Sequence, residues 1–97
     1  MAKAPRINLN RIRKLVGAGR FIFSYHAKER AFQRGITTDQ TISTILYGEI
    51  IETFDDEKPC PKAHIEGFIG DVICHVIVAE CKENIVIITV YISEEDN

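Results

Sequence analysis

The stretch SYHAKERAFQRGITTD, residues 24–39, decides how this chain is organised. A helix that begins near Tyr25 places His26, Arg30 and Arg34 at i, i+4 and i+8, so one imidazole and two guanidinium groups share one stripe. Like charges at this spacing repel by about 0.2–0.5 kcal/mol, and no carboxylate lies on the stripe. The pattern is therefore unfavourable for an isolated helix and indicates an anionic ligand, because arginine presents a fork of donors that suits phosphate.

Helix and strand signals continue on both sides of this stretch. Gly35 is a typical helix stop, and Thr37 with Gln40 forms a capping box that starts a second helix over Thr38–Tyr47. The last two strands of the chain are apolar on both faces, so we expect them to be central, with helices over one side. The other expected elements are an amphipathic helix capped by Asn8 or Asn10 and ended by Gly17 and Gly19, an extended segment over Arg20–Tyr25, and strands over Glu49–Phe54, Ala63–Ile69, Val72–Glu80 and Ile85–Ile92.

These elements predict an α+β fold, with N-terminal helices packed on a small, mainly antiparallel sheet. The 97 residues are 45% hydrophobic, which suits one domain over residues 1–97 with one modest core. We expect residues 1–6 and 94–97 to be disordered ends. The N-terminus lacks a signal-peptide pattern, and no run reaches the roughly 18 apolar residues of a membrane span. The sequence therefore predicts a cytoplasmic protein that does not enter membranes.

The three cysteines also bear on the cellular compartment. Cys60, Cys74 and Cys81 are odd in number and lack a paired spacing, which argues against a disulfide framework and suits a reducing compartment. We expect Cys74 and Cys81 to be buried free thiols. Cys60 and His64 with a later cysteine or histidine would supply zinc ligands, but no tight ligand pair is present, so we predict neither a metal nor another cofactor.

Charge is divided unevenly along the chain. Residues 1–38 hold nine lysines and arginines against Glu29 alone, giving +8, whereas residues 39–97 hold three basic and thirteen acidic residues, giving −10. One interpretation is a basic face for an anionic partner such as RNA. The other is that the two halves attract each other within the fold.

Several short motifs also occur in a fixed order: HAKER from His26 and RGIT from Arg34, then GEIIE from Gly48, HVIV from His75 and ITVY from Ile88. This combination resembles a bacterial family of domains of unknown function, family 4258, over roughly residues 21–92. That family is grouped with the RelE/ParE-like toxin and nuclease fold. The resemblance implies this fold more directly than it implies an activity.

Polar side chains interrupt the two apolar strands. His75 lies in one strand, and Thr89 and Tyr91 lie in the next. If the connection leaves an odd number of residues unpaired, His75 shares a sheet face with both and lies beside one of them. Two readings stay open: a half-buried histidine bonded to a neighbouring hydroxyl, or part of a functional patch.

The leading hypothesis is a metal-independent endoribonuclease, the toxin of a toxin–antitoxin pair, with RNA and an antitoxin-like protein as partners. His26 or His75 would act as base or acid, and Arg30 and Arg34 would stabilise the phosphate. Tyr91 would be a further proton donor, and Thr89 an auxiliary group.

Two alternatives accompany this hypothesis. The first is a non-catalytic interaction or regulatory module of the same fold, and the second is a nucleic-acid binder without turnover. A catalytic site requires His26, Arg30, His75 and Tyr91 to converge within roughly 10 Å. The catalytic assignment fails if His75 points into the core while the arginines pair with carboxylates such as Glu49 or Glu52.

Overall fold

In the computed structural model, which describes residues 7–93, three helices form where the sequence supplies their caps. They are α1 (Leu9–Gly17), α2 (Tyr25–Arg34) and α3 (Thr38–Tyr47). The side chains of Asn8, Ser24 and Thr37 each accept a hydrogen bond from a backbone N–H of the first turn. The predicted capping box is present at α3, and Gly35 ends α2 in the left-handed conformation at φ 69°. The predicted disorder at residues 1–6 and 94–97 lies outside the described residues.

Five strands form one sheet in the order β1-β5-β4-β3-β2. They are β1 (Phe21–Phe23), β2 (Glu49–Phe54), β3 (Lys62–Ile69), β4 (Val72–Cys81) and β5 (Asn84–Ser93). All neighbours are antiparallel except β1, which pairs in parallel with the first half of β5. The predicted α+β class, the mainly antiparallel sheet and the central position of β4 are confirmed.

The extended segment at Arg20–Tyr25 is shorter than predicted, for a physical reason. Ser24 leaves the strand to cap α2, with its hydroxyl accepting from Ala27 N at 3.0 Å. The same hydroxyl donates to the backbone oxygen of Ile88 at 3.0 Å, and Ser24 N donates to Ile87 O at 2.9 Å. Ser24 therefore ties the start of α2 to the middle of β5.

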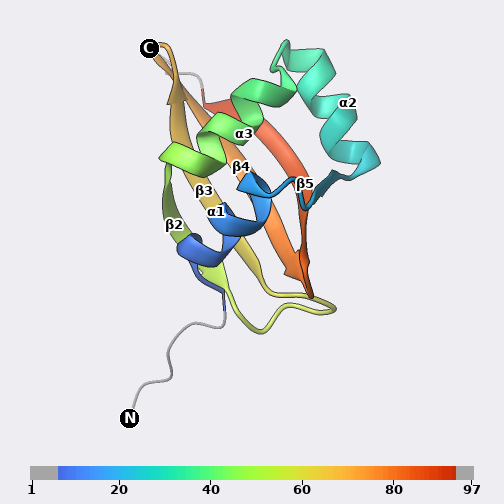
Figure 1. The fold of residues 1–97 in the computed structure, drawn as a ribbon. Coiled ribbons are helices and arrows are strands. Elements are labelled where there is room, and N and C mark those ends of the chain that lie inside the picture. The colour runs from blue at the N-terminus through green and yellow to red at the C-terminus, as the bar shows by residue number, and fades with distance from the viewer. Residues whose placement is uncertain (1–6, 94–97) are drawn as a thin grey trace.

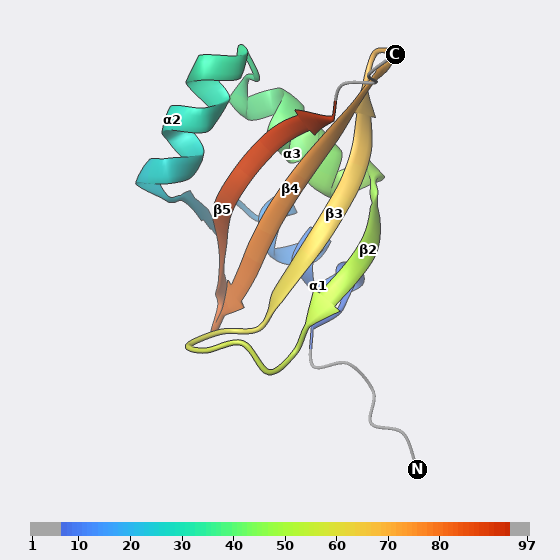
Figure 2. The ribbon, with the colours of Figure 1, turned by 180° about the vertical axis from the view of Figure 1, so that it is seen from behind.

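The three helices all cover the same face of the sheet (Figure 1). Seen from behind, β2, β3, β4 and β5 present a face that no helix covers (Figure 2). We call this second surface the open face. The core lies between the helices and the first face, and it is built mostly from β-branched residues and alanines: Ile7, Ile12, Val16, Ala27, Ala31, Ile36, Ile45, Ala63, Ile65, Cys74, Val76, Val78, Ile85, Ile87 and Val90.

The cysteines depart from the sequence prediction. Cys60 and Cys81 form a disulfide across 21 positions of sequence, with Cα atoms 5.3 Å apart, so the prediction of a free thiol at Cys81 is wrong. Glu80 N donates to Pro61 O, which extends the pairing of β3 and β4 until Cys60 lies beside Cys81. Sequence spacing did not show this pairing because it depends on the strand register. The disulfide also removes the thiol argument for a reducing compartment.

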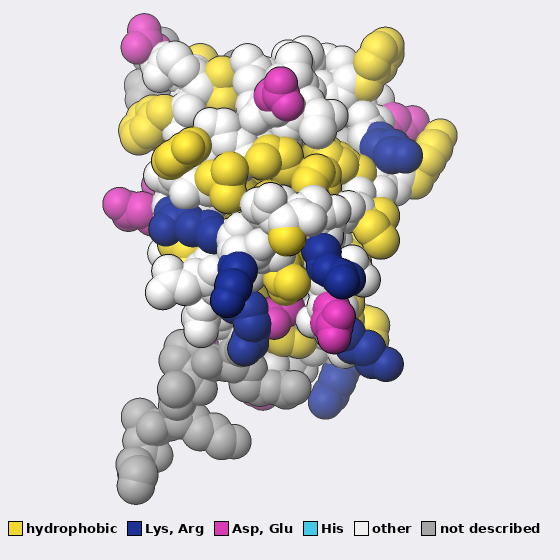
Figure 3. All heavy atoms as spheres, in the orientation of Figure 1, with side chains coloured by type: hydrophobic (Ala, Val, Ile, Leu, Met, Phe, Trp, Pro, Cys, Tyr) yellow, Lys and Arg dark blue, Asp and Glu magenta, His cyan; other side chains and the backbone are white. Residues whose placement is uncertain are grey.

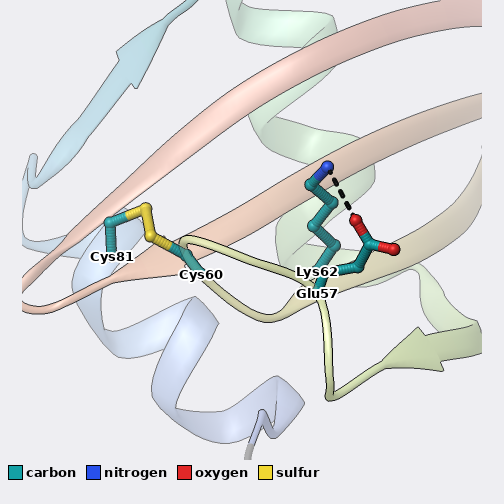
Figure 4. Close-up of a disulfide and its surroundings, with 4 residues drawn as sticks. All are labelled: Glu57, Cys60, Lys62 and Cys81. Atoms are coloured by element: carbon teal, nitrogen blue, oxygen red, sulfur yellow. Dashed lines mark hydrogen bonds and ion pairs between the residues drawn. A yellow bond between two sulfur atoms is a disulfide. The ribbon is translucent and has the colours of Figure 1, made fainter.

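Cys74 agrees with its prediction, because it is a buried free thiol and burial raises its pKa. The loop before β3 is held at two points (Figure 4). One is the disulfide, and the other is an ion pair between Lys62 and Glu57 at 3.3 Å.

Breaking the disulfide tests how far it stabilises this end of the sheet. We expect Cys60→Ser to lower the free energy of unfolding by about 3 kcal/mol, because an unlinked unfolded chain recovers the entropy of a loop of this length. Urea unfolding without reductant measures the difference. As a control, wild-type protein in excess reductant should have the same free energy of unfolding as the variant. Reductant should leave the free energy of unfolding of the variant unchanged. Equal stability of the oxidised wild type and the variant would contradict this role.

Candidate functional site

Two imidazoles and a phenol gather on the open face. His64 lies on β3, His75 on β4 and Tyr91 on β5. His64 Nε2 and His75 Nδ1 are 2.8 Å apart, a direct hydrogen bond between the two rings. The His75 ring stacks on Tyr91, with ring centroids 4.6 Å apart and planes inclined by 11°. We call these three residues the imidazole cluster.

The pleat of the strands explains why these side chains share a face. The neighbours of His64, Ala63 and Ile65, are fully buried in the core, so His64 must point to the opposite side. Cys74 and Val76 impose the same direction on His75. No histidine side chain is visible on the face that carries the helices (Figure 3).

A register shift in β5 completes the cluster. Ile77 pairs with Thr89, but the next residue of β4, Val78, pairs with Ile87, so one residue of β5 is inserted. This insertion brings Thr89 and Tyr91 to the face of His75, and the partner of His75 is Tyr91. The prediction that His75 shares a face with Thr89 and Tyr91 and lies beside one of them is therefore confirmed, although the odd residue lies within β5 and not in the turn. The predicted hydroxyl partner of His75 is replaced by the imidazole of His64, since a ring on the adjacent strand reaches its Nδ1 atom.

The hydrogen bond couples the two histidines chemically. One ring nitrogen must donate and the other must accept, so the tautomer of one imidazole determines that of the other. Burial lowers the pKa of His64, and His75 lowers it further, while Glu66 and Glu52 oppose the shift. His64 is therefore held in the neutral form that accepts a proton. His75, at 8% exposure, is nearly closed to solvent, whereas Tyr91 is 36% exposed.

Carboxylates border the cluster on the β2 side. Glu66 is the β3 partner of His75, and Glu52 is the β2 partner of His64. Glu49 lies beyond Glu66 in the same cross-strand row. The open face is therefore acidic at β2 and aromatic at β5.

The stripe on α2 does not contact the imidazole cluster. His26, Arg30 and Arg34 are exposed, and their side chains make no hydrogen bond, ion pair or ring contact within residues 7–93. The arginines therefore do not pair with Glu49 or Glu52, the arrangement that would have argued against a site. Whether all four predicted groups act on one substrate stays a prediction.

Other basic side chains do pair with the acidic half. Arg11 binds Glu80, which is 9% exposed, and Arg20 lies 3.8 Å from Glu83. Dark blue basic side chains also gather over α1 (Figure 3). The basic and acidic parts of the chain thus attract each other at these two pairs, and neither pair includes a residue of the α2 stripe.

His64 is the residue that sequence reasoning missed as a member of this site. Sequence spacing singles out His64 only as a zinc ligand, although its place between two inward-facing apolar residues, Ala63 and Ile65, is a signal for the open face. In the part of the chain that is described, no three histidine, cysteine or acidic side chains are arranged to hold a metal ion. None of the described helices is long and apolar enough to cross a membrane.

Comparison with known proteins identifies the family. The family model described as Domain of unknown function (DUF4258) matches residues 23–92, so the chain belongs to this family. The matched segment includes α2 and all three residues of the imidazole cluster. No curated protein and no solved structure matches the chain.

The lowered pKa of His64 makes stability depend on pH. In the unfolded chain His64 binds a proton near its ordinary pKa of 6.5, whereas in the folded chain it binds one only at lower pH. The stability that is present above the unfolded pKa is therefore lost as pH falls through the folded pKa. We expect His64→Gln to lose less stability than wild type between about pH 7.5 and about pH 5, measured by urea unfolding. Phe68→Leu, on the same strand and face, is the control and should lose as much stability as wild type over this pH range. Parallel pH profiles for wild type and His64→Gln would refute this account.

Proposed function

We propose that this member of the family is a metal-independent endoribonuclease with a RelE/ParE-like fold, the toxin of a bacterial toxin–antitoxin pair. The observation that supports this proposal most strongly is the direct hydrogen bond between His64 and His75 on the open face. When His64 Nε2 donates to His75 Nδ1, the other ring nitrogen of neutral His64 carries no proton and can act as a proton acceptor. The aromatic ring of Tyr91 on His75 restricts the pair further.

The proposed reaction needs only proton transfers and charge stabilisation. Neutral His64 takes the proton of a ribose 2′-hydroxyl, and the 2′-oxygen attacks the adjacent phosphorus. The bond from phosphorus to the 5′-oxygen breaks, and that oxygen receives a proton from Tyr91 or His26. The products are a 2′,3′-cyclic phosphate and a 5′-hydroxyl. His75 acts as a positioning residue, because it contacts His64 and is nearly closed to solvent.

The α2 stripe supplies the positive charge that the proposed reaction needs. Arg30 and Arg34 are exposed and have no anionic partner within residues 7–93, so they remain available to phosphate. Ser24 fixes the start of α2 to β5, the strand that carries Tyr91. In the proposed complex an RNA strand binds α2 and crosses β5 to reach His64.

A second candidate function is a non-catalytic interaction module. It is favoured by the carboxylates of Glu49, Glu52 and Glu66, which border the histidines and repel phosphate. In this alternative the open face binds a basic protein segment, and the histidines serve packing and hydrogen bonding.

RNA cleavage distinguishes the two functions. We expect the purified protein to cut a single-stranded RNA in the presence of EDTA, and His64→Gln to slow cleavage by about 100-fold or more because the proton acceptor is lost. Phe68→Leu should keep wild-type activity, and His26→Gln shows whether the α2 histidine takes part. A wild-type protein that leaves RNA intact, or an undiminished His64→Gln variant, would favour the interaction module.

Salt dependence tests the phosphate role of α2. We expect RNA affinity to fall steeply with salt and Arg30→Ala to reduce the slope of log affinity against log salt by about one phosphate contact. Fluorescence anisotropy at several salt concentrations measures this slope. The charge-matched control is Lys82→Asn, which removes a cation from the β4–β5 turn while asparagine tolerates the positive φ there. The assignment is wrong if both variants change the slope equally.

A further inference from the structure

We propose that a pocket at the junction of α3, β2 and β3 binds an arginine side chain presented by another protein. The pocket has a volume of about 310 Å³, and its lining includes Tyr47, at the end of α3, and Phe68 on β3. Glu49 and Glu66 are also among its lining residues. None of the proposed catalytic residues lines this pocket, and the inference does not depend on ribonuclease activity.

The two aromatic side chains are unusually exposed. Tyr47 is 82% and Phe68 is 72% accessible to solvent. Large apolar groups in this position leave area that a partner can bury. Because they border a hollow rather than a flat surface, they are suited to bind a planar cation through contact with a ring face.

The carboxylates specify the charge of the ligand. Glu49 and Glu66 are direct cross-strand partners, and like charges in this arrangement repel. Neither side chain forms an ion pair within residues 7–93. A cation bound between them would relieve this repulsion.

Gly48 and Gly67 also line the pocket. A Cβ at Gly48 would overlap the backbone oxygens of Glu66 and Thr44, so the end of α3 lies directly against β3. Helix C-termini attract cations through their free carbonyl groups. The chain already shows this preference, since the Arg13 guanidinium donates to the backbone oxygens of Ile45 and Gly48.

The neighbouring edge of the sheet indicates that the arginine belongs to a protein. β2 is the outermost strand, and no other strand within residues 7–93 pairs with its outer edge. An extended segment can hydrogen-bond along such an edge while one side chain reaches the pocket beside it. Arginine suits the site better than lysine because its planar group both stacks on rings and binds two carboxylate oxygens.

Nuclear magnetic resonance with a minimal probe tests the pocket in the full chain. We expect N-acetyl-arginine methylamide to shift the backbone amide signals of Gly48 and Gly67 and to saturate with a dissociation constant on the order of millimolar. The neutral isostere N-acetyl-citrulline methylamide should not bind. Glu49→Gln and Tyr47→Ala should each weaken binding about threefold, since each removes one exposed contact.

Phe32→Ala is the matched control, because Phe32 is equally exposed, at 87%, but lies on α2. It should bind the arginine probe as wild type does. The proposal is overturned if no amide of the pocket shifts, if citrulline binds as well as arginine, or if Phe32→Ala weakens binding as much as Tyr47→Ala. Equal affinity for N-acetyl-lysine methylamide would overturn the assignment to arginine.

Discussion

The alternation of side chains across the pleat is the constraint on which the rest of this structure depends. Helices cover only one face of the sheet, so each residue that enters the core forces its strand neighbours onto the open face. Ala63 and Ile65 direct His64 outward, and Cys74 and Val76 do the same for His75. The imidazole cluster is thus a consequence of core packing on the other side of the same strands.

A second constraint is the distribution of charge. The basic first part of the chain and the acidic remainder meet at the Arg11–Glu80 and Arg20–Glu83 pairs. These pairs join α1 and the segment after it to the end of β4 and the turn that follows it. The α2 stripe takes no part in this pairing, and neither do Glu49 and Glu66. Within residues 7–93, charge of opposite sign therefore remains unpaired at two places, and each place favours a different class of partner.

The two proposals use these two regions separately. The ribonuclease proposal combines the hydrogen-bonded histidines with the cations of α2, whereas the arginine pocket uses the acidic, aromatic end of β2 and β3. A cross-strand row connects them, because Glu49 pairs with Glu66, Glu66 with His75 and His75 with Tyr91. A protein bound at the pocket would therefore lie next to the imidazole cluster.

The sequence by itself determined the elements whose signals are local. Helix caps at Asn8, Ser24 and Thr37, the stop at Gly35 and the apolar strands depend on neighbours a few positions away, so their prediction succeeded and the α+β class followed. It also indicated that His75 and Tyr91 share a face. Only the tertiary structure decided which groups meet across strands. The β3–β4 register brought His64 to His75 and Cys60 to Cys81, and the inserted residue in β5 placed Tyr91, in place of Val90, opposite His75. Register depends on loop lengths and on packing of the whole core, and a shift of one residue moves every side chain of a strand to the other face.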